Sequence, residues 1–286
     1  MRALICLALA AGLCAQEEAI QNTGAPIRLP FACAAEDIPW AGLSCTEEEP
    51  CEVYLELVSF EVLGNRMFAS GNFHTAEVTL YSIFLTSEDG GKTWREAFQR
   101  IRGGGLDQIR FHGFDSGWVA GGILHPLPRD PFLLITRDGG KTWLRKRMFS
   151  DGRSGAILDF AFTSPRQGTL LFDRGGSEDG MRYQLYESPA GGDTWIVREA
   201  SEKPLTIRRR AAPAGDSRVR ADARTRAYHL ERRSGDTWKT VAAFLVEVDP
   251  CKPPPEPETE PPPEPAEPKP ETEATDTFVI RPRPQK

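Results

Sequence analysis

The sequence predicts an all-β protein with a β-propeller-like fold of at least four four-stranded antiparallel blades, followed by a disordered C-terminal tail. Three observations predict it. An eight-residue motif ending in Thr-Trp recurs along the middle of the chain, apolar and polar residues alternate between its copies, and the composition changes abruptly near residue 250. Repeats of this length are typical of propeller blades, whereas a proline-rich segment cannot build a core.

The N-terminus has the pattern of a secretory signal peptide. Residues 1–15 hold one basic residue, an apolar run from Ala3 to Leu13 and small residues near its end. We expect cleavage after Ala15 and export to the periplasm or the extracellular space. The run is too short to span a bilayer and no later window reaches the necessary length, so a membrane-spanning protein is not expected. Lipidation at Cys14 is the alternative, although the residue before a lipidated cysteine is normally small.

Four cysteines remain after cleavage, three of them in an N-terminal segment, 16–52. An even number of cysteines in an exported chain indicates disulfides, with free buried thiols as the alternative. Four cysteines allow three pairings, and the sequence does not choose among them. Their separations favour one short N-terminal loop and one bridge to the last cysteine. No zinc-ligand spacing is present, so no metal site is expected. The disulfide candidates are Cys33, Cys45, Cys51 and Cys251.

The repeat motif defines a predicted domain over residues 53–250. Ser87–Trp94 recurs as Thr136–Trp143, with the same residues from the Asp to the Trp. A third copy, Ser188–Trp195, lacks the Asp, and a fourth, Ser234–Trp238, is shortened. The tryptophans are 49, 52 and 43 residues apart. Four short strands and their turns fill such a period, so each copy marks one blade.

Strands are predicted at matching places in each unit. The first strand alternates apolar and polar residues, which is typical of a half-buried strand. Its starts are Val58–Phe60, Ile109–Phe111, Phe160–Phe162 and Leu205–Ile207. Second strands are expected near 67–71, 118–122, 169–172 and 218–221, and third strands near 81–85, 132–135, 183–186 and 227–230. The strand after each Trp completes a four-stranded meander.

The motif itself suits a hairpin turn between the third and fourth strands. Its Asp and its hydroxyl residues can hydrogen-bond to backbone groups of the same turn, and its paired glycines supply positive φ. The Trp then fills space between neighbouring sheets. Nothing in this arrangement needs a ligand, so we expect a structural role for Ser87, Asp89, Gly90, Gly91, Thr93, Trp94, Thr136, Asp138, Gly139, Gly140, Thr142, Trp143, Ser188, Gly191, Gly192, Thr194, Trp195 and Trp238.

These motifs resemble the Asp-box, or bacterial neuraminidase, repeat of exported propellers. The Gly-Trp-x-x-Gly stretch in Phe111–Gly122, followed by Ile135–Trp143, is most similar to the photosystem II assembly and stability factor family. The resemblance covers about residues 53–245 and implies a non-enzymatic binding or assembly role, without identifying a photosystem as client. The family's ring usually has more than four blades, so residues 16–52 and 240–250 could supply another blade or complete one of the four.

A sialidase-like or other glycoside hydrolase is the alternative, because such enzymes also carry Asp boxes. Pro26–Pro30 resembles their Arg-Ile-Pro motif, in which the arginine, here Arg28, binds the sugar carboxylate. The remaining residues of such a site are not recognisable. Many carboxylates are present, yet none is marked by its context as half of a catalytic pair. We therefore assign no catalytic residue and no cofactor, and expect a protein that is not an enzyme.

One segment is basic although the chain has a net charge of −6. Ser201–Thr240 contains 11 basic and 5 acidic residues, and several arginines alternate as on one sheet face. An acidic protein surface, an anionic envelope component or the chain's own tail would fit it. Export argues against nucleic acid, and a solvated blade edge is the plain alternative. The oligomeric state is not predicted. The candidate binding residues are Arg208, Arg210, Arg218 and Arg220.

The predicted tail, 251–286, is rich in Pro, Glu and Thr. Residues 250–286 hold 13 of the chain's 24 prolines. Such a segment forms a semi-rigid polyproline II spacer. Phe278–Ile280 near its end is predicted to be a docking peptide or, equally, a frayed terminus. The sequence thus favours an exported scaffold protein, for instance an assembly or stability factor for an envelope or membrane complex, with the tail as a tether.

Overall fold

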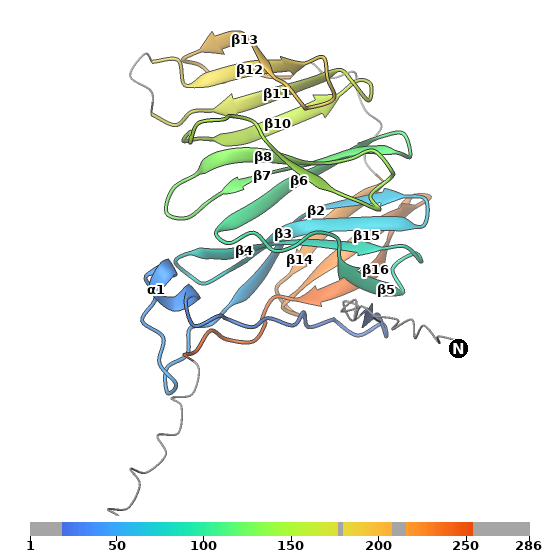
Figure 1. The fold of residues 1–286 in the computed structure, drawn as a ribbon. Helices are drawn as coiled ribbons and strands as arrows, with labels where there is room; N and C mark the ends of the chain where they lie inside the picture. The colour runs from blue at the N-terminus through green and yellow to red at the C-terminus, as the bar shows by residue number, and fades with distance from the viewer. Residues whose placement is uncertain (1–18, 177–179, 208–215, 254–286) are drawn as a thin grey trace, which may run out of the picture. The chain divides into compact units, whose positions relative to one another are not determined.

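The computed structural model describes residues 19–176, 180–207 and 216–253. They belong to one compact unit that ends at Pro254, while residues 255–286 form a second unit outside the described part. The predicted signal peptide and most of the predicted tail also lie outside it. Figure 1 shows that the described residues form antiparallel β-sheets and one short helix. These residues make up four sheets. The all-β, propeller-like fold class is confirmed.

The first three sheets follow the predicted meander, with the strands of each blade hydrogen-bonded in chain order. In the first sheet they are β2 (Tyr54–Leu63), β3 (Arg66–His74), β4 (Thr79–Ser87) and β5 (Thr93–Glu96). In the second they are β6 (Gly104–His112), β7 (Ser116–Ile123), β8 (Arg129–Thr136) and β9 (Leu144–Arg147). In the third they are β10 (Ala156–Phe162), β11 (Gly168–Asp173), β12 (Tyr183–Ser188) and β13 (Ile196–Ser201).

The fourth sheet differs from the prediction. In the described residues it has three strands, which are β14 (Ser217–Asp222), β15 (Ala227–Ser234) and β16 (Thr237–Leu245). The strand predicted at Leu205–Ile207 is wrong, because those residues lie outside every strand. Pro204 directly precedes this short run and has no N–H to donate to a ladder, so the alternation alone does not form a strand there.

The order of the sheets in space is fourth, first, second, third. Strand β14 and its neighbour β15 pack against β2, β6 packs against β2, β3 and β4, and β10 packs against the second sheet. Three clusters of buried apolar side chains fill the interfaces. At one interface Trp143 of the second sheet lies edge-on to Phe84 of the first, 4.9 Å between ring centroids. At the next, Trp118 stacks on Phe162 of the third sheet at 3.6 Å.

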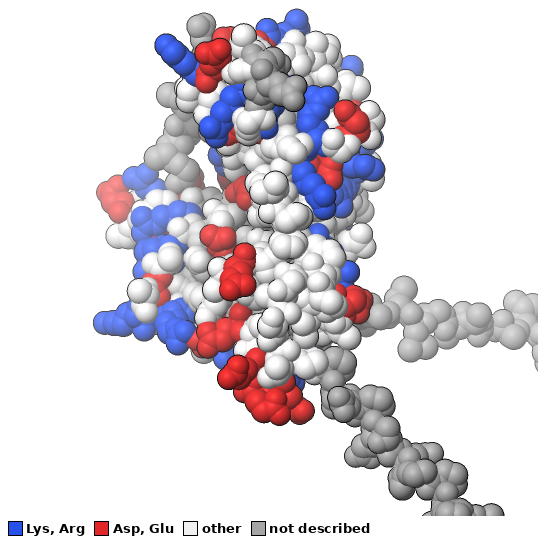
Figure 2. Space-filling view, turned by 90° about the vertical axis from the view of Figure 1, so that its left-hand side faces the viewer, with Lys and Arg blue, Asp and Glu red and all other residues white. Residues whose placement is uncertain are grey.

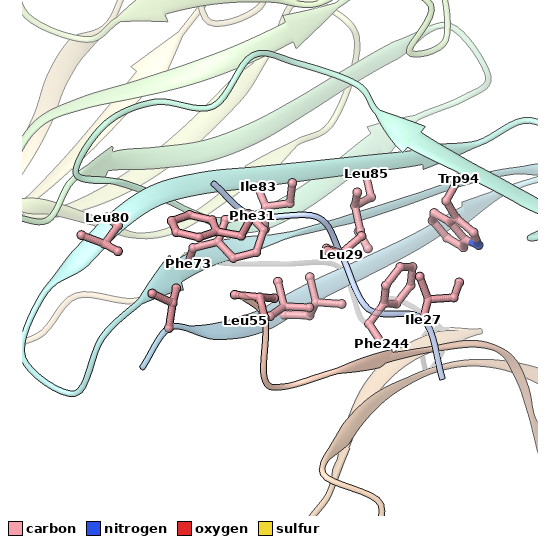
Figure 3. Close-up of a cluster of buried hydrophobic side chains, with 14 of the residues drawn as sticks. Ile27, Leu29, Phe31, Leu55, Phe73, Leu80, Ile83, Leu85, Trp94 and Phe244 are labelled. Carbon is pink, nitrogen blue, oxygen red and sulfur yellow. The ribbon is translucent and has the colours of Figure 1, made fainter. Parts of the chain in front are cut away.

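The N-terminal segment completes the first sheet instead of forming a blade of its own. Strand β1 (Ile20–Gln21) pairs with the outer edge of β5. The chain then crosses to the fourth sheet, where Ile27 bridges Phe244. Figure 3 shows Ile27, Leu29 and Phe31 lying among the side chains of the first sheet. All three are less than 8% exposed, and burial of each stabilises the fold by roughly 1.5–3 kcal/mol.

Two disulfides and a short helix hold the same segment. Cys33 pairs with Cys251, and Cys45 pairs with Cys51, which is the arrangement that the separations favoured. Helix α1 (Asp37–Ala41) begins at a buried carboxylate. Asp37 accepts hydrogen bonds from the Tyr81 hydroxyl, at 2.7 Å, and from the Arg102 guanidinium. The described residues contain no helix that is long and apolar enough to cross a membrane.

Candidate binding surfaces

The repeated turns that contain Asp-Gly-Gly, here called boxes, use their polar groups for hydrogen bonds within the same turn. Asp89 accepts hydrogen bonds from the backbone N–H of Lys92 and of Thr93 and from the Thr93 hydroxyl, at 2.7–3.0 Å. Ser87 donates to Asp89 and accepts from the N–H of Gly91. Partial burial by itself would raise the pKa of Asp89, but the hydrogen bonds from Thr93 and Ser87 outweigh it and lower the pKa to about 2. The carboxylate is thereby held ionised by its own turn.

The second box repeats this geometry, and the third keeps part of it. Hydrogen bonds from the Thr142 side chain and backbone lower the pKa of Asp138 to about 2. In the third box Ser188 still accepts from the N–H of Gly192, at 2.8 Å. The fourth copy differs more from the first box, because its Thr237 hydroxyl donates to the backbone carbonyl of Ser234.

The boxes also join neighbouring blades. The Arg66 guanidinium of the first sheet donates to the carbonyl of Gly139 in the second box. The indole of Trp118, in the second sheet, donates to the carbonyl of Gly191 in the third box, at 2.8 Å. Gly140 has φ +88°, and a Cβ there would lie 2.4 Å from the Phe68 ring. These contacts support the structural role that the sequence predicted for the boxes.

The predicted basic site divides into a described half and a half outside the description. Arg208 and Arg210 lie outside the described residues. Arg218 and Arg220 lie on β14 and donate from Nε to the two oxygens of Glu231, at 2.7 and 2.8 Å. Glu231 is 4% exposed. Burial would raise its pKa, but the hydrogen bonds and charges of the two arginines lower it. The carboxylate therefore offsets part of the positive charge.

The sheet ends opposite the boxes form a second surface, built by the longer loops. Figure 2 views this loop end and shows Asp and Glu gathered at its lower edge, with Lys and Arg numerous higher up. Two hollows open there, one of about 400 Å³ lined by the second sheet and one of about 380 Å³ between loops of the second and third sheets. The sequence reasoning missed them, because their residues come from loops and strand ends that carry no motif. The density of basic residues over 129–153, seven against three acidic, was the available signal.

A third feature is the outer edge of the third sheet. Nearly every residue of β13 is exposed, including Ile196 (51%) and Val197 (47%). In the first sheet the corresponding edge strand, β5, is covered by β1. Within the described part of the chain no strand pairs with the outer edge of β13.

The arginine of the sialidase-like motif lies at the surface. Arg28 forms an ion pair with Asp249 at 3.5 Å, and both side chains are about half exposed or more. A different carboxyl group, that of Asp107, has a shifted pKa. Asp107 occupies a bulge on β6, at the place where Val58 bulges from β2 and Leu158 from β10. Burial, with a smaller contribution from the charge of Glu56, raises the pKa of Asp107 to about 6.

Comparison with known proteins shows distant structural likenesses. No family model matches the chain, and no curated protein matches its sequence. Among solved structures, YCF48 bound to a D1 peptide is 16% identical, with 69% of this chain and 60% of that chain covered and a TM-score of 0.37. YCF48 from Cyanidioschyzon merolae is 19% identical, with 69% and 58% covered and a TM-score of 0.35.

An enzyme is also among the similar structures. A xyloglucanase from Xanthomonas campestris is 17% identical, with 46% of this chain and 18% of that chain covered and a TM-score of 0.35. The chain thus spans less than two thirds of the length of each of these three proteins. At this level of likeness their activities and ligands do not carry over to this chain.

Proposed function

We propose that this protein is an exported, non-enzymatic scaffold that binds another protein through the outer surface of its blades, as an assembly or stability factor of an envelope complex would. One observation carries the proposal: the edge strand β13 exposes its backbone edge together with Ile196 and Val197. Apolar side chains beside an unpaired strand edge favour the addition of a partner strand.

The arginines of the fourth sheet fit a second contact. Arg218 and Arg220 use their Nε atoms for Glu231, and their side chains are 44% and 40% exposed. The guanidinium of Arg218 lies over the Trp238 ring at 4.2 Å, which fixes its orientation. Such oriented groups suit an anionic partner. With the arginines at 208 and 210 they remain our proposed binding residues.

The test is capture of a partner from an envelope extract by the mature chain, followed by reconstitution with the purified partner. The double variant Ile196→Lys/Val197→Lys should weaken reconstituted binding, because lysines on an edge strand discourage strand addition. Val58→Lys is the control, since Val58 is 41% exposed on β2, a strand that packs against the second and fourth sheets. Full binding by the edge variant, with a melting temperature like that of the control, would contradict the proposed surface.

A glycoside hydrolase is the second candidate, and Asp107 is the observation that favours it. A carboxyl group whose pKa is raised to about 6 near another carboxylate is suited to general acid catalysis. The expected outcome under our proposal is no release of reducing sugar from pectin, xyloglucan or sialylated glycoprotein. Hydrolysis that disappears in Asp107→Asn would instead establish the enzyme.

A further inference from the structure

The two hollows at the loop end adjoin across the loop between β7 and β8. The first hollow, of about 400 Å³, is lined by Ile123, Asp130, Arg145 and Arg147. The second, of about 380 Å³, has Leu127 and Pro128 of this loop in its lining. Between them Arg129 bridges to Ser154, so one short stretch of backbone forms a wall of both.

The lining of the first hollow has two guanidinium groups and a single carboxylate, that of Asp130, to balance their positive charge. Burial lowers the pKa of Arg145, the nearby Arg147 lowers it further, and only Asp130 acts in the opposite sense. The Arg145 guanidinium lies over the buried Phe132 ring at 4.1 Å. Its Nε is buried and has no hydrogen-bond partner among the described residues. A buried donor of this kind costs free energy unless a ligand accepts from it.

In the first sheet the same position is occupied by an acidic residue that has a partner. Two residues after the box Trp, the first sheet carries Glu96 and the second carries Arg145. Glu96 accepts from Arg100 at 2.6 Å in a self-contained ion pair. At Arg145 the charge is instead repeated by Arg147, and the nearby Asp130 is held at a positive φ of 48°, a conformation that costs energy in a non-glycine residue.

The second hollow is chemically different. Its charged residues are Asp173, Arg174 and Arg182. Asp173 accepts two hydrogen bonds from Arg182, at 2.8 and 2.7 Å, and Arg174 donates to the carbonyl of Met181 at 3.2 Å. The remainder of its lining is leucine, proline, alanine and glycine apart from Ser154, with Leu127 69% exposed at the rim. No aromatic side chain lines either hollow among the described residues. An aliphatic group therefore fits better than a sugar ring, which would favour an aromatic platform.

We propose that the paired hollows bind an acidic segment of a partner protein, with a carboxylate on Arg145 and Arg147 and a neighbouring aliphatic side chain in the second hollow. The planar edge of a guanidinium matches a carboxylate in a bidentate geometry. This inference rests on the proposed protein-binding function and names the chemistry of one contact. It does not depend on the β13 edge.

The test uses the full mature chain and a short fluorescent peptide of Glu-Ala-Leu repeats, with its Gln-Ala-Leu counterpart and oligogalacturonate as competitors. The double variant Arg145→Met/Arg147→Gln removes the charges while Met keeps an apolar stem on Phe132, and should weaken peptide binding about tenfold or more. Gly176→Leu should also weaken it, because a Cβ there meets nothing within 4 Å and the side chain would occupy the second hollow.

Arg95→Gln is the control for loss of an arginine elsewhere on the surface, because it removes an arginine paired with Glu88 in the first sheet, and it should leave peptide affinity unchanged. Equal binding of the Gln peptide, or unchanged affinity in the double variant, would overturn the proposal. Stronger binding of oligogalacturonate than of the Glu peptide would also overturn it in favour of a polysaccharide. Partner capture that survives in these variants but fails in the β13 edge variant would sink this inference alone and leave the proposed function standing.

Discussion

At the residue scale, the box aspartates act on their own turns. Asp138 receives hydrogen bonds from the Thr142 hydroxyl and N–H and from the Thr136 hydroxyl. Asp138→Ala should therefore lower stability by roughly 1 kcal/mol, a few degrees in melting temperature. Asp236→Ala, in the decayed fourth copy, is the control and should change little. A melting temperature of Asp138→Ala equal to that of the control, combined with loss of partner binding, would show that the box is functional instead.

The depressed pKa of Asp138 makes its contribution depend on pH. Its pKa is about 2 in the folded chain against 3.8 ordinarily, so its stabilising effect is present above pH 3.8 and disappears as the pH falls towards 2. Asp138→Asn keeps the shape but not the charge. Urea unfolding at successive pH values should show the two proteins converging below about pH 4. A difference that stays constant down to pH 2 would contradict the assignment.

Glu231 is the residue that keeps two neighbouring arginines of the fourth sheet in place. Glu231→Gln should destabilise the chain by about 1–2 kcal/mol, less than a fully buried pair would lose, because both arginines are partly exposed. Unfolding by urea measures it, and Glu199→Gln on the exposed strand β13 is the control. No loss of stability would mean that the arginines are held by other contacts, such as Trp238.

At the scale of elements, the N-terminal segment joins the first and fourth sheets. Strand β1 pairs with β5, Ile27 bridges Phe244, and Cys33 is tied to Cys251. The double variant Cys33→Ser/Cys251→Ser should lose about 2–5 kcal/mol, because this bridge closes most of the described chain. Opening the short Cys45–Cys51 loop should cost less, and thermal unfolding compares the two variants. A larger loss from the short loop would contradict this account.

At the scale of the whole molecule, we expect the proline-rich tail to act as a tether. Deletion of residues 255–286 should leave the melting temperature within the error of measurement, because the compact unit ends at Pro254. If the tail joins a second partner, the deletion should abolish that contact. If it binds the arginines instead, the contact should weaken with salt. Indifference of all binding to the deletion would identify the tail as a passive segment.

The sequence by itself determined the repeat and therefore the fold class, because the turns that contain Asp-Gly-Gly are formed by residues adjacent in the chain. Asp89, Gly90 and Gly91 need no distant partner to make their turn. The same locality explains why first strands such as the one at Val58–Phe60 were placed correctly. The prediction failed at Leu205–Ile207, where apolar and polar residues alternate but the segment is not hydrogen-bonded into a sheet.

Only the tertiary structure decided what lies between the repeats. The contacts of Arg218 with Glu231 and of β1 with β5, and the hollow beside Arg145, depend on how strands cross and stack. The number of basic residues in a segment locates positive charge along the chain, but it does not tell which carboxylate lies opposite each arginine. The reason is physical: electrostatic partners and hollows are set by distances in space, and these follow from sheet packing and not from the order of residues.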